Sequence, residues 1–358
     1  KQTLQNLRML LNFYNITVRY NVIKKLVEIS GPKLQFSRDN YEEATRTTVI
    51  SLCMQHELPV SHINEFLQLI ADENQFNPIQ EWILSEPWDG ITRIQPLLNT
   101  IHTKSNDVRD LIIPKWALSC LYSWLSLDGQ ASHVVPVLQG PQGIGKDRWC
   151  KALFPKSMSN YILEGHSVNP QNKDSMINAV RHAITILSEL NASNRRNTQD
   201  EFKAWITSDE DKIRLPYGRS ERVMPRRTTF IATVNELDFL KDDTGNRRFA
   251  VLEIIDIDPN HEINMQQFWA EIYELSKDRS RTPWLSQPEI QWLQKHNENF
   301  EETSSVEERI KRMFDWGKPR SRLMTATEIC LEIGITNATR PELNQAAKGA
   351  RMCLQLDR

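Results

Sequence analysis

Apolar residues recur at spacings of three and four over much of the first hundred positions. Leu4, Leu7 and Leu11 are one example of this spacing. A repeat near 3.6 residues puts side chains on one face of a helix. The stretch at 17–29 alternates instead, which leaves a pair of strands open as an alternative there. The pattern predicts a mainly helical accessory or oligomerisation domain over residues 1–103.

The period of the apolar positions changes after a helical stretch that ends near residue 125. Short apolar runs then follow at 133–138, 183–187, 228–234 and 248–254. Helical spacing lies between most of these runs, which is typical of a largely parallel sheet covered by helices. We therefore expect a three-layer α/β domain over residues 104–277.

The composition becomes more polar at residues 277–283, where charged and hydroxyl side chains precede a proline. The helix-like segments beyond it have small apolar positions such as Ile329 and Ala346. This predicts a linker and a small helical unit over residues 278–358.

The composition is that of a globular protein, with 39% hydrophobic and 25% charged residues. No apolar run approaches the roughly 20 residues that span a bilayer, and no signal-peptide core follows the amino end, so we expect a cytoplasmic protein without membrane contact. The net charge is -2, from 44 basic and 46 acidic residues. Any contact with nucleic acid must therefore be local.

Three of the twelve glycines fall within one short loop, and they form a G-x-x-x-x-G-K pattern between a predicted strand and a predicted helix. The residues are Gly140, Gly143, Gly145 and Lys146. Glycines allow the loop to aim successive N–H groups at phosphate oxygens, and the lysine reaches the β and γ phosphates. The loop therefore predicts an ATP site.

The residue after the lysine, where a hydroxyl side chain usually binds Mg²⁺, is Asp147. A carboxylate also ligates Mg²⁺. Without the ion it would repel a phosphate at roughly 4 Å by about 1 kcal/mol in water and about 4 kcal/mol at an effective dielectric of roughly 20. ATP binding should therefore depend strongly on Mg²⁺, and a weakened site is the alternative.

Polar residues beside the predicted strands are candidates for the rest of the site. Glu189 follows the run at 183–187 and would hold Mg²⁺ and orient the attacking water, and Asn235 would position the same water. Arg247 and Arg248 carry planar guanidiniums that suit γ-phosphate charge, a role that a neighbouring subunit can fill. The alternatives are a helix-cap acid, a turn amide and a surface ion pair.

The most basic window of the chain lies between these candidates. Its bases, which Glu221 alone opposes, are Lys212, Arg214, Arg219, Arg222, Arg226 and Arg227. A turn with Tyr217 lies at its centre, so we expect a hairpin whose tip contacts a DNA backbone and stacks on a base. An ordinary solvated hairpin is the alternative.

Five segments in this order resemble the virulence-associated E family, the primase-helicase-type ATPases of prophages and phage satellites that are related to superfamily-three helicases. The segments are FNPIQEWILSEPWDGITRI (76–94), VPVLQGPQGIGKDRW (135–149), ITILSEL (184–190), DKIRLPYGRSERVMPRR (211–227) and FIATVNELDFLKDDTGNRRF (230–249). The resemblance implies a P-loop AAA+ type core, a ring that is usually hexameric, and ATP sites between subunits. It also implies a small winged-helix-like DNA-binding unit at the carboxyl end.

By position in these segments, the resemblance assigns phosphate binding to Gly145 and Lys146, and the Mg²⁺ and water acid to Glu189. It likewise makes Asn235 the sensor asparagine, Arg247 and Arg248 the terminal arginines, and 212–227 the loop of a central channel. Departures from the family pattern are Asp147, the residues Ile186 and Ser188 where a second acid is absent, and Ala250 in place of an aromatic residue.

The resemblance implies a ring-forming, ATP- and Mg²⁺-dependent DNA helicase or translocase that acts in replication of a prophage or phage satellite. Its partners would be single-stranded or forked DNA, or an origin duplex, and further copies of the chain. An origin-binding initiator scaffold that binds ATP with little turnover is the alternative, because Asp147 replaces a hydroxyl residue. A generic P-loop signalling ATPase is a second alternative. The chain shows no primase pattern in its first hundred residues and begins without Met, so an upstream domain is a further expectation.

Overall fold

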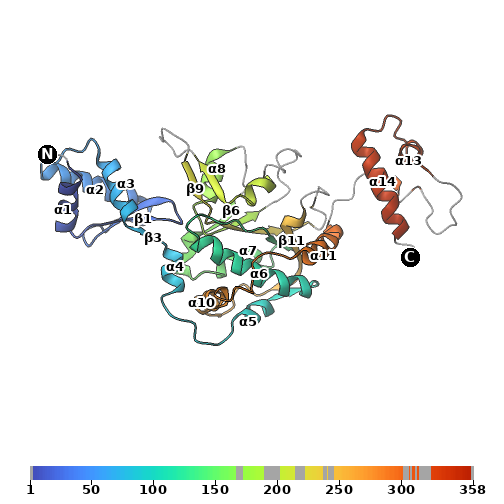
Figure 1. Ribbon diagram of the computed structural model, residues 1–358, viewed down its shortest axis with the longest axis horizontal. Helices are drawn as coiled ribbons and strands as arrows, with labels where there is room; N and C mark the ends of the chain where they lie inside the picture. Colours follow the sequence, from blue (N-terminus) through green and yellow to red (C-terminus); the bar gives the residue numbers. More distant parts are fainter. Residues whose placement is uncertain are drawn as a thin grey trace. The chain divides into compact units, whose positions relative to one another are not determined.

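The protein is described by a computed structural model (Figure 1). The described residues are 3–166, 172–188, 202–213, 222–236, 240, 246–300, 306, 309–310, 313 and 324–355. The chain divides into two compact units, one formed by 1–237 with 245–297 and the other by 238–244 with 298–358.

A sheet of six strands is the centre of the first unit. In spatial order its strands are β4 (Ile101–Thr103), β11 (Phe249–Ile257), β5 (Val135–Gln139), β10 (Thr229–Val234), β7 (Ile184–Ser188) and β6 (Ile162–His166). All neighbours are parallel except β4, which is antiparallel to β11. Strands of a parallel sheet are covered on both faces, which explains why β5 and β10 are buried at every position. The expected α/β fold with a largely parallel sheet is confirmed.

Helices and short segments surround this sheet. They are α4 (Pro78–Ile83), α5 (Ile94–Asn99), α6 (Asn106–Leu125), α7 (Lys146–Ala152), η2 (Lys156–Tyr161), α8 (Lys173–Ala179), η3 (Asn246–Arg248), α10 (Met265–Ser276) and α11 (Gln287–Asn297). Helix α6 packs on β11, β5 and β10, and α10 packs on α6 (Figure 1). Buried indoles tie α6 to the sheet, since Trp116 Nε1 donates to Phe230 O at 2.9 Å and Trp124 Nε1 donates to Ala183 O at 2.9 Å.

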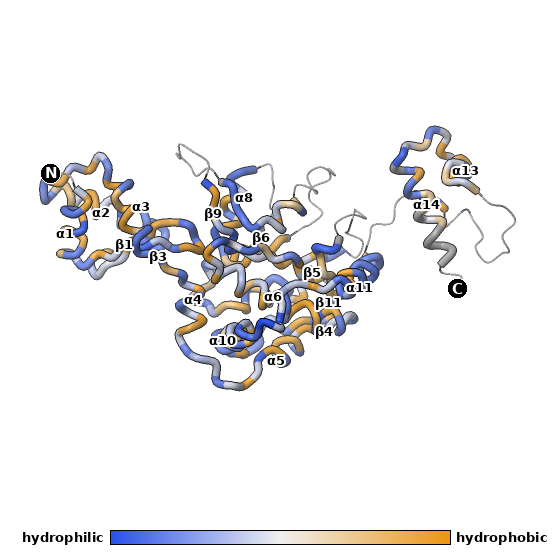
Figure 2. The backbone as a smooth tube through the Cα atoms, in the orientation of Figure 1, coloured by the Kyte–Doolittle hydropathy of each residue, from blue (hydrophilic) through white to orange (hydrophobic). Residues whose placement is uncertain are grey.

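Helix α11 covers one edge of β11 along the first half of the strand, where β4 does not yet pair with it. Asn297 Nδ2 donates to Phe249 O at 2.7 Å, and His296 Nε2 lies 2.9 Å from Val251 O. Two residues after Val251 on the same strand, Glu253 O accepts a hydrogen bond from Lys104 N at 3.0 Å, just before the pairing of β11 with β4 begins. Figure 2 shows that the residues of β11 are mostly hydrophobic and those of α11 mostly hydrophilic.

The amino-terminal segment has its own hydrophobic cluster and a small sheet of order β2-β1-β3. Its elements are α1 (Leu4–Phe13), β1 (Thr17–Asn21), β2 (Leu26–Ser30), η1 (Arg38–Asn40), α2 (Tyr41–Gln55), α3 (Ile63–Glu73) and β3 (Gln75–Phe76). Strands β1 and β2 are antiparallel. The strand pair that the sequence left open at 17–29 is therefore present, between helices.

A two-stranded sheet of β8 (Glu210–Ile213) and β9 (Arg222–Pro225) completes the first unit. The second unit contains η4 (Glu298–Phe300), α13 (Ala326–Glu332) and α14 (Arg340–Gln355). A capping box of Thr325 and Glu328 begins α13. The hydrophobic core of this unit includes Ile329, Cys330 and Ala346. Within the described ranges, no helix combines the length and apolar character needed to cross a bilayer.

Candidate functional site

The glycine loop after β5 has a conformation that only glycines allow at low cost. Gly143 and Gly145 have φ of +86° and +99°, in the left-handed region. A Cβ on Gly145 would lie 2.9 Å from Pro259 Cγ, and one on Gly140 would lie 2.6 Å from Ile254 O. A Cβ on Gly143 would meet nothing within 4 Å, so open space adjoins the loop there.

Lys146 begins α7 and is held by three oxygen atoms. It is only 6% exposed. Its Nζ donates to Gly140 O at 2.7 Å, Pro141 O at 2.8 Å and Asn235 Oδ1 at 2.9 Å. All three acceptors are neutral, so these contacts orient the ammonium without neutralising its charge.

Burial lowers the pKa of Lys146, and the negative charge of neighbouring Asp147 partly opposes that shift. The Asp147 side chain is exposed in the first turn of α7. An oriented, incompletely neutralised cation in a glycine loop that adjoins open space at Gly143 fits a phosphate group. A neighbouring exposed carboxylate fits a Mg²⁺ ion on that phosphate.

The sheet order explains why Lys146 and Asn235 meet although 89 positions separate them. The chain leaves β5 for β6 at one edge of the sheet, and it leaves β10 for β11 on the other side of β5. Adjacent parallel strands whose connections run in opposite directions form a switch point, where α/β proteins bind ligands at the carboxyl ends of the strands. Lys146 follows β5 and Asn235 follows β10, so both lie at this switch point.

Sequence reasoning missed a second wall of this loop, formed by residues after β11. Pro259 lies against Gly145, and the Asn260 side chain accepts a hydrogen bond from Arg148. Trp149 Nε1 donates to Thr100 Oγ1 at 2.7 Å, which fixes α7 from the other side. Nothing in the local sequence at 259–260 signals this role, because it depends on the parallel pairing of β11 with β5.

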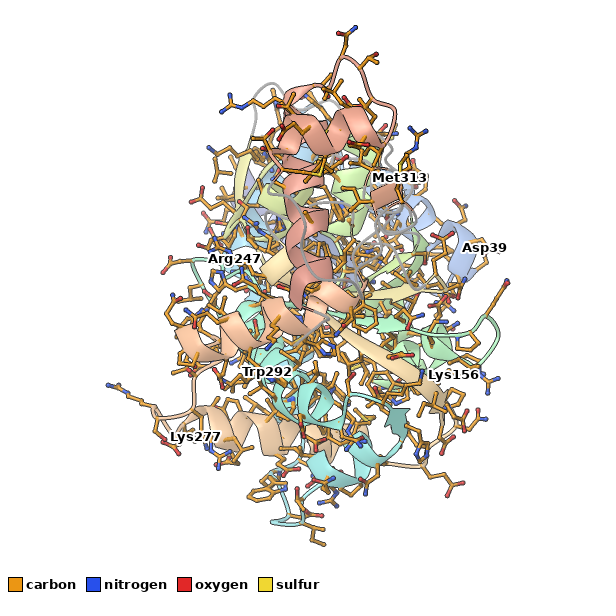
Figure 3. The ribbon with its side chains drawn as sticks, turned by 90° about the vertical axis from the view of Figure 1, so that its right-hand side faces the viewer. Asp39, Lys156, Arg247, Lys277, Trp292 and Met313 are labelled. Carbon is orange, nitrogen blue, oxygen red and sulfur yellow. The ribbon has the colours of Figure 1, made fainter. Side chains whose placement is uncertain are left out.

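Arg247 and Arg248 do not lie near Lys146 of the same chain. They precede β11, and Phe249 pairs with Val135 at the amino end of β5. Lys146 lies beyond the carboxyl end of β5, a strand of five residues that is about 16 Å long at roughly 3.3 Å per residue. The Arg247 side chain is exposed (Figure 3).

The basic window forms an antiparallel hairpin at its two described ends. Lys212 on β8 and Arg222 on β9 are exposed. Four predicted site residues, Glu189, Arg214, Tyr217 and Arg219, lie outside the described residues.

Two bases of this window are bound by other parts of the protein, one fully buried and one half-buried. Arg226 is fully buried, and its Nε donates to Asp211 Oδ1 at 2.8 Å. Arg227 Nε donates to Ser126 O at 3.1 Å, and burial lowers its pKa. Glu221 is the one acidic residue within 212–227, but Asp211, one residue before this window, also opposes its charge by pairing with Arg226.

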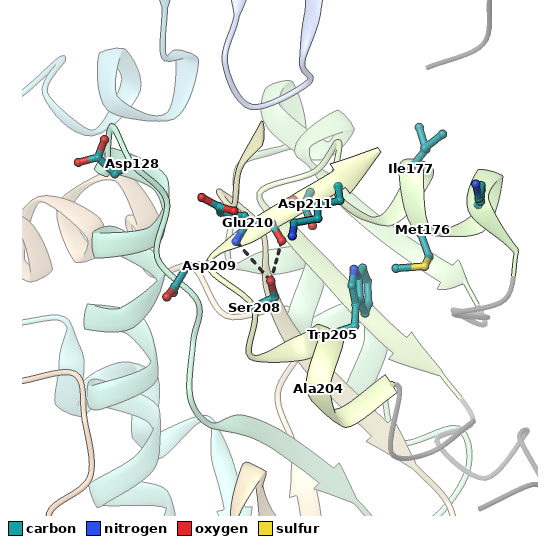
Figure 4. A pocket seen from close by; sticks show the side chains of 11 residues that line it. Asp128, Met176, Ile177, Ala204, Trp205, Ser208, Asp209, Glu210 and Asp211 are labelled. Atoms are coloured by element: carbon teal, nitrogen blue, oxygen red, sulfur yellow. Dashed lines mark hydrogen bonds between the residues drawn. The ribbon is translucent and has the colours of Figure 1, made fainter. Parts of the chain in front are cut away.

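A cavity of about 650 Å³ lies beside the base of the hairpin (Figure 4). Trp205, Met176 and Asp211 are among its lining residues. Its acidic lining is partly engaged, since Asp209 accepts a hydrogen bond from Ala131 N at 2.7 Å and Asp211 binds Arg226. Its lining residues fall at 128, 173–177 and 204–212 and do not include the residues that contact Lys146, so the cavity is distinct from the lysine site.

Comparison with known proteins gives a family and a fold. The sequence model of the virulence-associated protein E-like domain matches residues 83–302. None of the curated proteins matches the chain. The apo structure of the NrS-1 C-terminal region is similar at a TM-score of 0.51 and 15% identity, over 99% of this chain and 90% of that chain. The A form apo structure of that region has a TM-score of 0.49 at 16% identity, over 88% and 79%.

Proposed function

Because the chain belongs to the virulence-associated protein E-like family, we propose that it is an ATP-dependent DNA helicase or translocase that acts in replication of a prophage or phage satellite. The observation that carries the proposal is the Lys146 ammonium, which is oriented by neutral oxygens at a switch point. A buried cation arranged in this way serves an anionic ligand better than it serves stability.

In this proposal ATP and Mg²⁺ are the cofactors. Gly143, Gly145 and Lys146 would hold the phosphates, and Asp147 with Glu189 would hold the metal. Bound Mg²⁺ neutralises charge on the β and γ phosphates. Lys146 can turn its ammonium from a backbone carbonyl to a phosphate oxygen while Asn235 keeps it in place. The Asn235 amide can also orient a water molecule.

The proposal further includes a P-loop AAA+ type core and a cytoplasmic ring, usually a hexamer. Arg247 and Arg248 lie at the opposite end of the strands from Lys146 of their own chain. In a ring they would instead approach the phosphates bound by a neighbouring copy. A guanidinium there would stabilise the negative charge of the γ-phosphoryl group in the transition state of hydrolysis.

DNA would bind to the hairpin through Lys212, Arg214, Tyr217, Arg219 and Arg222 in the same proposal. The exposure of Lys212 and Arg222 supports this assignment. The domain limits 1–103, 104–277 and 278–358, and a winged-helix-like fold of the last domain, are also part of the proposal.

Subunit mixing tests the shared site. One variant is Lys146→Ala, and the other is the double variant Arg247→Ala with Arg248→Ala. Each should lose ATPase activity stimulated by single-stranded DNA, and an equimolar mixture should recover part of it, because some interfaces then have both an intact lysine and intact arginines. Mixing Lys146→Ala with inactive Asn235→Ala is the control, since both changes affect the same side of the interface. No recovery in the first mixture would contradict sites between subunits.

The second candidate function is an origin-binding initiator scaffold that binds ATP with little turnover. The exposed carboxylate of Asp147 next to Lys146 favours it, because a hydroxyl residue is usual there. Steady-state turnover separates the two. Retained MgATP binding without DNA-stimulated hydrolysis, together with stimulation in Asp147→Thr, would support the scaffold. Unchanged DNA binding after neutralisation of Arg214 and Arg219 would instead support a P-loop signalling ATPase.

A further inference from the structure

The turn between β1 and β2 belongs to the amino-terminal sheet, yet its tip is buried in the core around the central six-stranded sheet. Val22 and Ile23 are 8% and 1% exposed and are part of the large cluster that includes the central strands. Asn21 stabilises the turn, since its Oδ1 accepts from Ile23 N and Lys24 N at 3.0 Å each. Its Nδ2 donates to the hydroxyl of Tyr161 at 3.1 Å. The turn is therefore anchored between the amino-terminal sheet and the core around the central sheet.

Lys25 ends this turn in a conformation that costs free energy. Its φ is +56°, which is uncommon for a residue other than glycine. Its N–H donates to Asn21 O at 2.8 Å, so the turn itself imposes this conformation. Strained residues of this kind persist where the surrounding structure requires them.

The side chain of Lys25 reaches a carboxylate in a distant part of the chain. Its Nζ donates to Asp211 Oδ2 at 2.8 Å, and the two side chains are 3% and 1% exposed. Burial lowers the pKa of Lys25, while the charge of Asp211 acts against that shift. Asp211 is on β8, so this bond joins the amino-terminal turn to the hairpin.

The second oxygen of the same carboxylate holds the other strand of the hairpin. Arg226, directly after β9, donates to Asp211 Oδ1 and also to Trp205 O at 3.2 Å. Its guanidinium lies over the Trp205 ring, 4.8 Å from the centroid. One buried carboxylate (labelled in Figure 4) thus connects the two strands at the base of the hairpin with the amino-terminal turn.

We propose that Lys25 is a positioning residue for the β8–β9 hairpin. Its ammonium fixes the Asp211 carboxylate, which fixes Arg226, so the amino-terminal domain sets the orientation of the hairpin. The consequence for DNA rests on the proposed function, because it requires that Lys212 and Arg222 contact DNA. The structural part of the inference does not depend on that function.

Hydrogen–deuterium exchange of the whole chain tests the structural part. In Lys25→Met, the amides of 210–213 and 222–225 should exchange at least tenfold faster, while those of α7 and β10 keep their wild-type rates. Lys24→Met is the matched control, since it removes a lysine of the same turn that pairs with Glu28 inside the same sheet. Lys25→Gly removes the ammonium but relieves the strain at φ. Exchange in the same strands should still be faster, because the bond to Asp211 is lost.

Two results of that experiment would overturn the inference. One is an unchanged exchange rate in β8 and β9 of both Lys25 variants. The other is an equal rise over the whole first unit, which would make Lys25 a general contributor to stability. Lys25→Arg retains a cation and should stay closer to wild type than Lys25→Met does.

Binding of single-stranded DNA tests the consequence. DNA affinity and the stimulation of ATPase activity by DNA should fall at least fivefold in Lys25→Met, with basal turnover and MgATP affinity unchanged. If wild-type protein binds no DNA while exchange in the hairpin responds to Lys25, the proposed function fails and the positioning role stands. If the wild type binds DNA and Lys25→Met binds it equally well, the positioning role for DNA fails.

Discussion

Two buried lysines of this protein are held in opposite ways. Lys25 donates to a carboxylate that also binds an arginine, whereas Lys146 donates to two carbonyls and an amide oxygen. Burial lowers the pKa of both. The charge of Lys25 is thus paired inside the protein, and the charge of Lys146 is oriented by neutral oxygens without being neutralised by them.

The two sites differ in what the loss of a side chain leaves behind. A protein is strongly destabilised when a buried charge loses its partner, as Lys25 and Arg226 would without Asp211, whereas Lys25→Met leaves Asp211 paired with Arg226. A cation among neutral oxygens carries no such penalty when it is replaced by an apolar side chain. Substitutions at the two sites should therefore affect different measurements.

The largest effect is expected for Asp211→Ala, which would leave Lys25 and Arg226 buried without their carboxylate. The free energy of unfolding should fall by about 3–5 kcal/mol. Urea denaturation measures it. Glu210→Ala, an exposed neighbour on the same strand, is the control and should change it by no more than about 0.5 kcal/mol. A loss equal to that of the control would show that the buried network contributes little.

Lys146→Met should act on binding and leave stability unchanged or raised. Charged hydrogen bonds to phosphate contribute about 1.5–3 kcal/mol each, so losing two should weaken MgATP binding about a hundredfold or more. Calorimetric titration measures the affinity, and thermal unfolding measures stability. Lys151→Met on the same helix, where the lysine pairs with Glu164, should bind MgATP normally. A large loss of stability with ATP affinity retained would reverse the comparison.

Asn235→Asp should make Lys146 resemble Lys25. A carboxylate at this position would pair with the ammonium and repel phosphate, and MgATP affinity should fall about tenfold, or about 1.4 kcal/mol. Asn235→Ala removes one neutral acceptor and should cost less. Competition with a fluorescent nucleotide measures both. Wild-type affinity in the aspartate variant would mean that the neutrality of the acceptors is unimportant.

The pH dependence of wild type and Asn235→Asp sharpens the same prediction. Since burial lowers the pKa of Lys146 below 10.5, its ammonium loses its proton earlier than an ordinary lysine does, and MgATP affinity should decline as pH rises through that lowered pKa. In Asn235→Asp the decline should move to higher pH, because the new carboxylate raises the pKa of Lys146.

The smallest effect is expected for an exposed ion pair, Asp89 with Arg93. The hydrogen bond from Arg93, then the one from Ile91 N, lowers the pKa of Asp89 from 3.8 to about 2. A lowered carboxyl pKa adds stability above 3.8 that is lost as pH falls through about 2. Asp89→Asn should therefore melt slightly earlier than wild type at pH 7, and the difference should vanish near pH 2. A difference that grows in acid would contradict this account.

The sheet was largely predictable from the sequence, and the reason is burial on both faces. The apolar runs at 183–187 and 228–234 coincide with β7 and β10, since central parallel strands have few polar positions. Strand β6 escaped prediction because it is at the edge of the sheet, and Glu164 and Gly165 interrupt its apolar character.

The candidate site was predictable residue by residue but not as an arrangement. The glycine pattern pointed to Lys146, yet the contact with Asn235 depends on which strands are neighbours. Arg226 shows the limit most plainly, since a buried and a solvated arginine look alike in sequence. Its partner network includes Lys25, which is 186 positions from Asp211, and no local pattern connects them.

The covering of β11 by α11 has a consequence for association. The carbonyls of Phe249, Val251 and Glu253 are already engaged by Asn297, His296 and Lys104. An exposed row of such groups would be a template for strand addition and aggregation. Because these carbonyls already accept hydrogen bonds, copies of the chain cannot associate by adding a strand to this edge of β11. Any association there must rely on side-chain contacts.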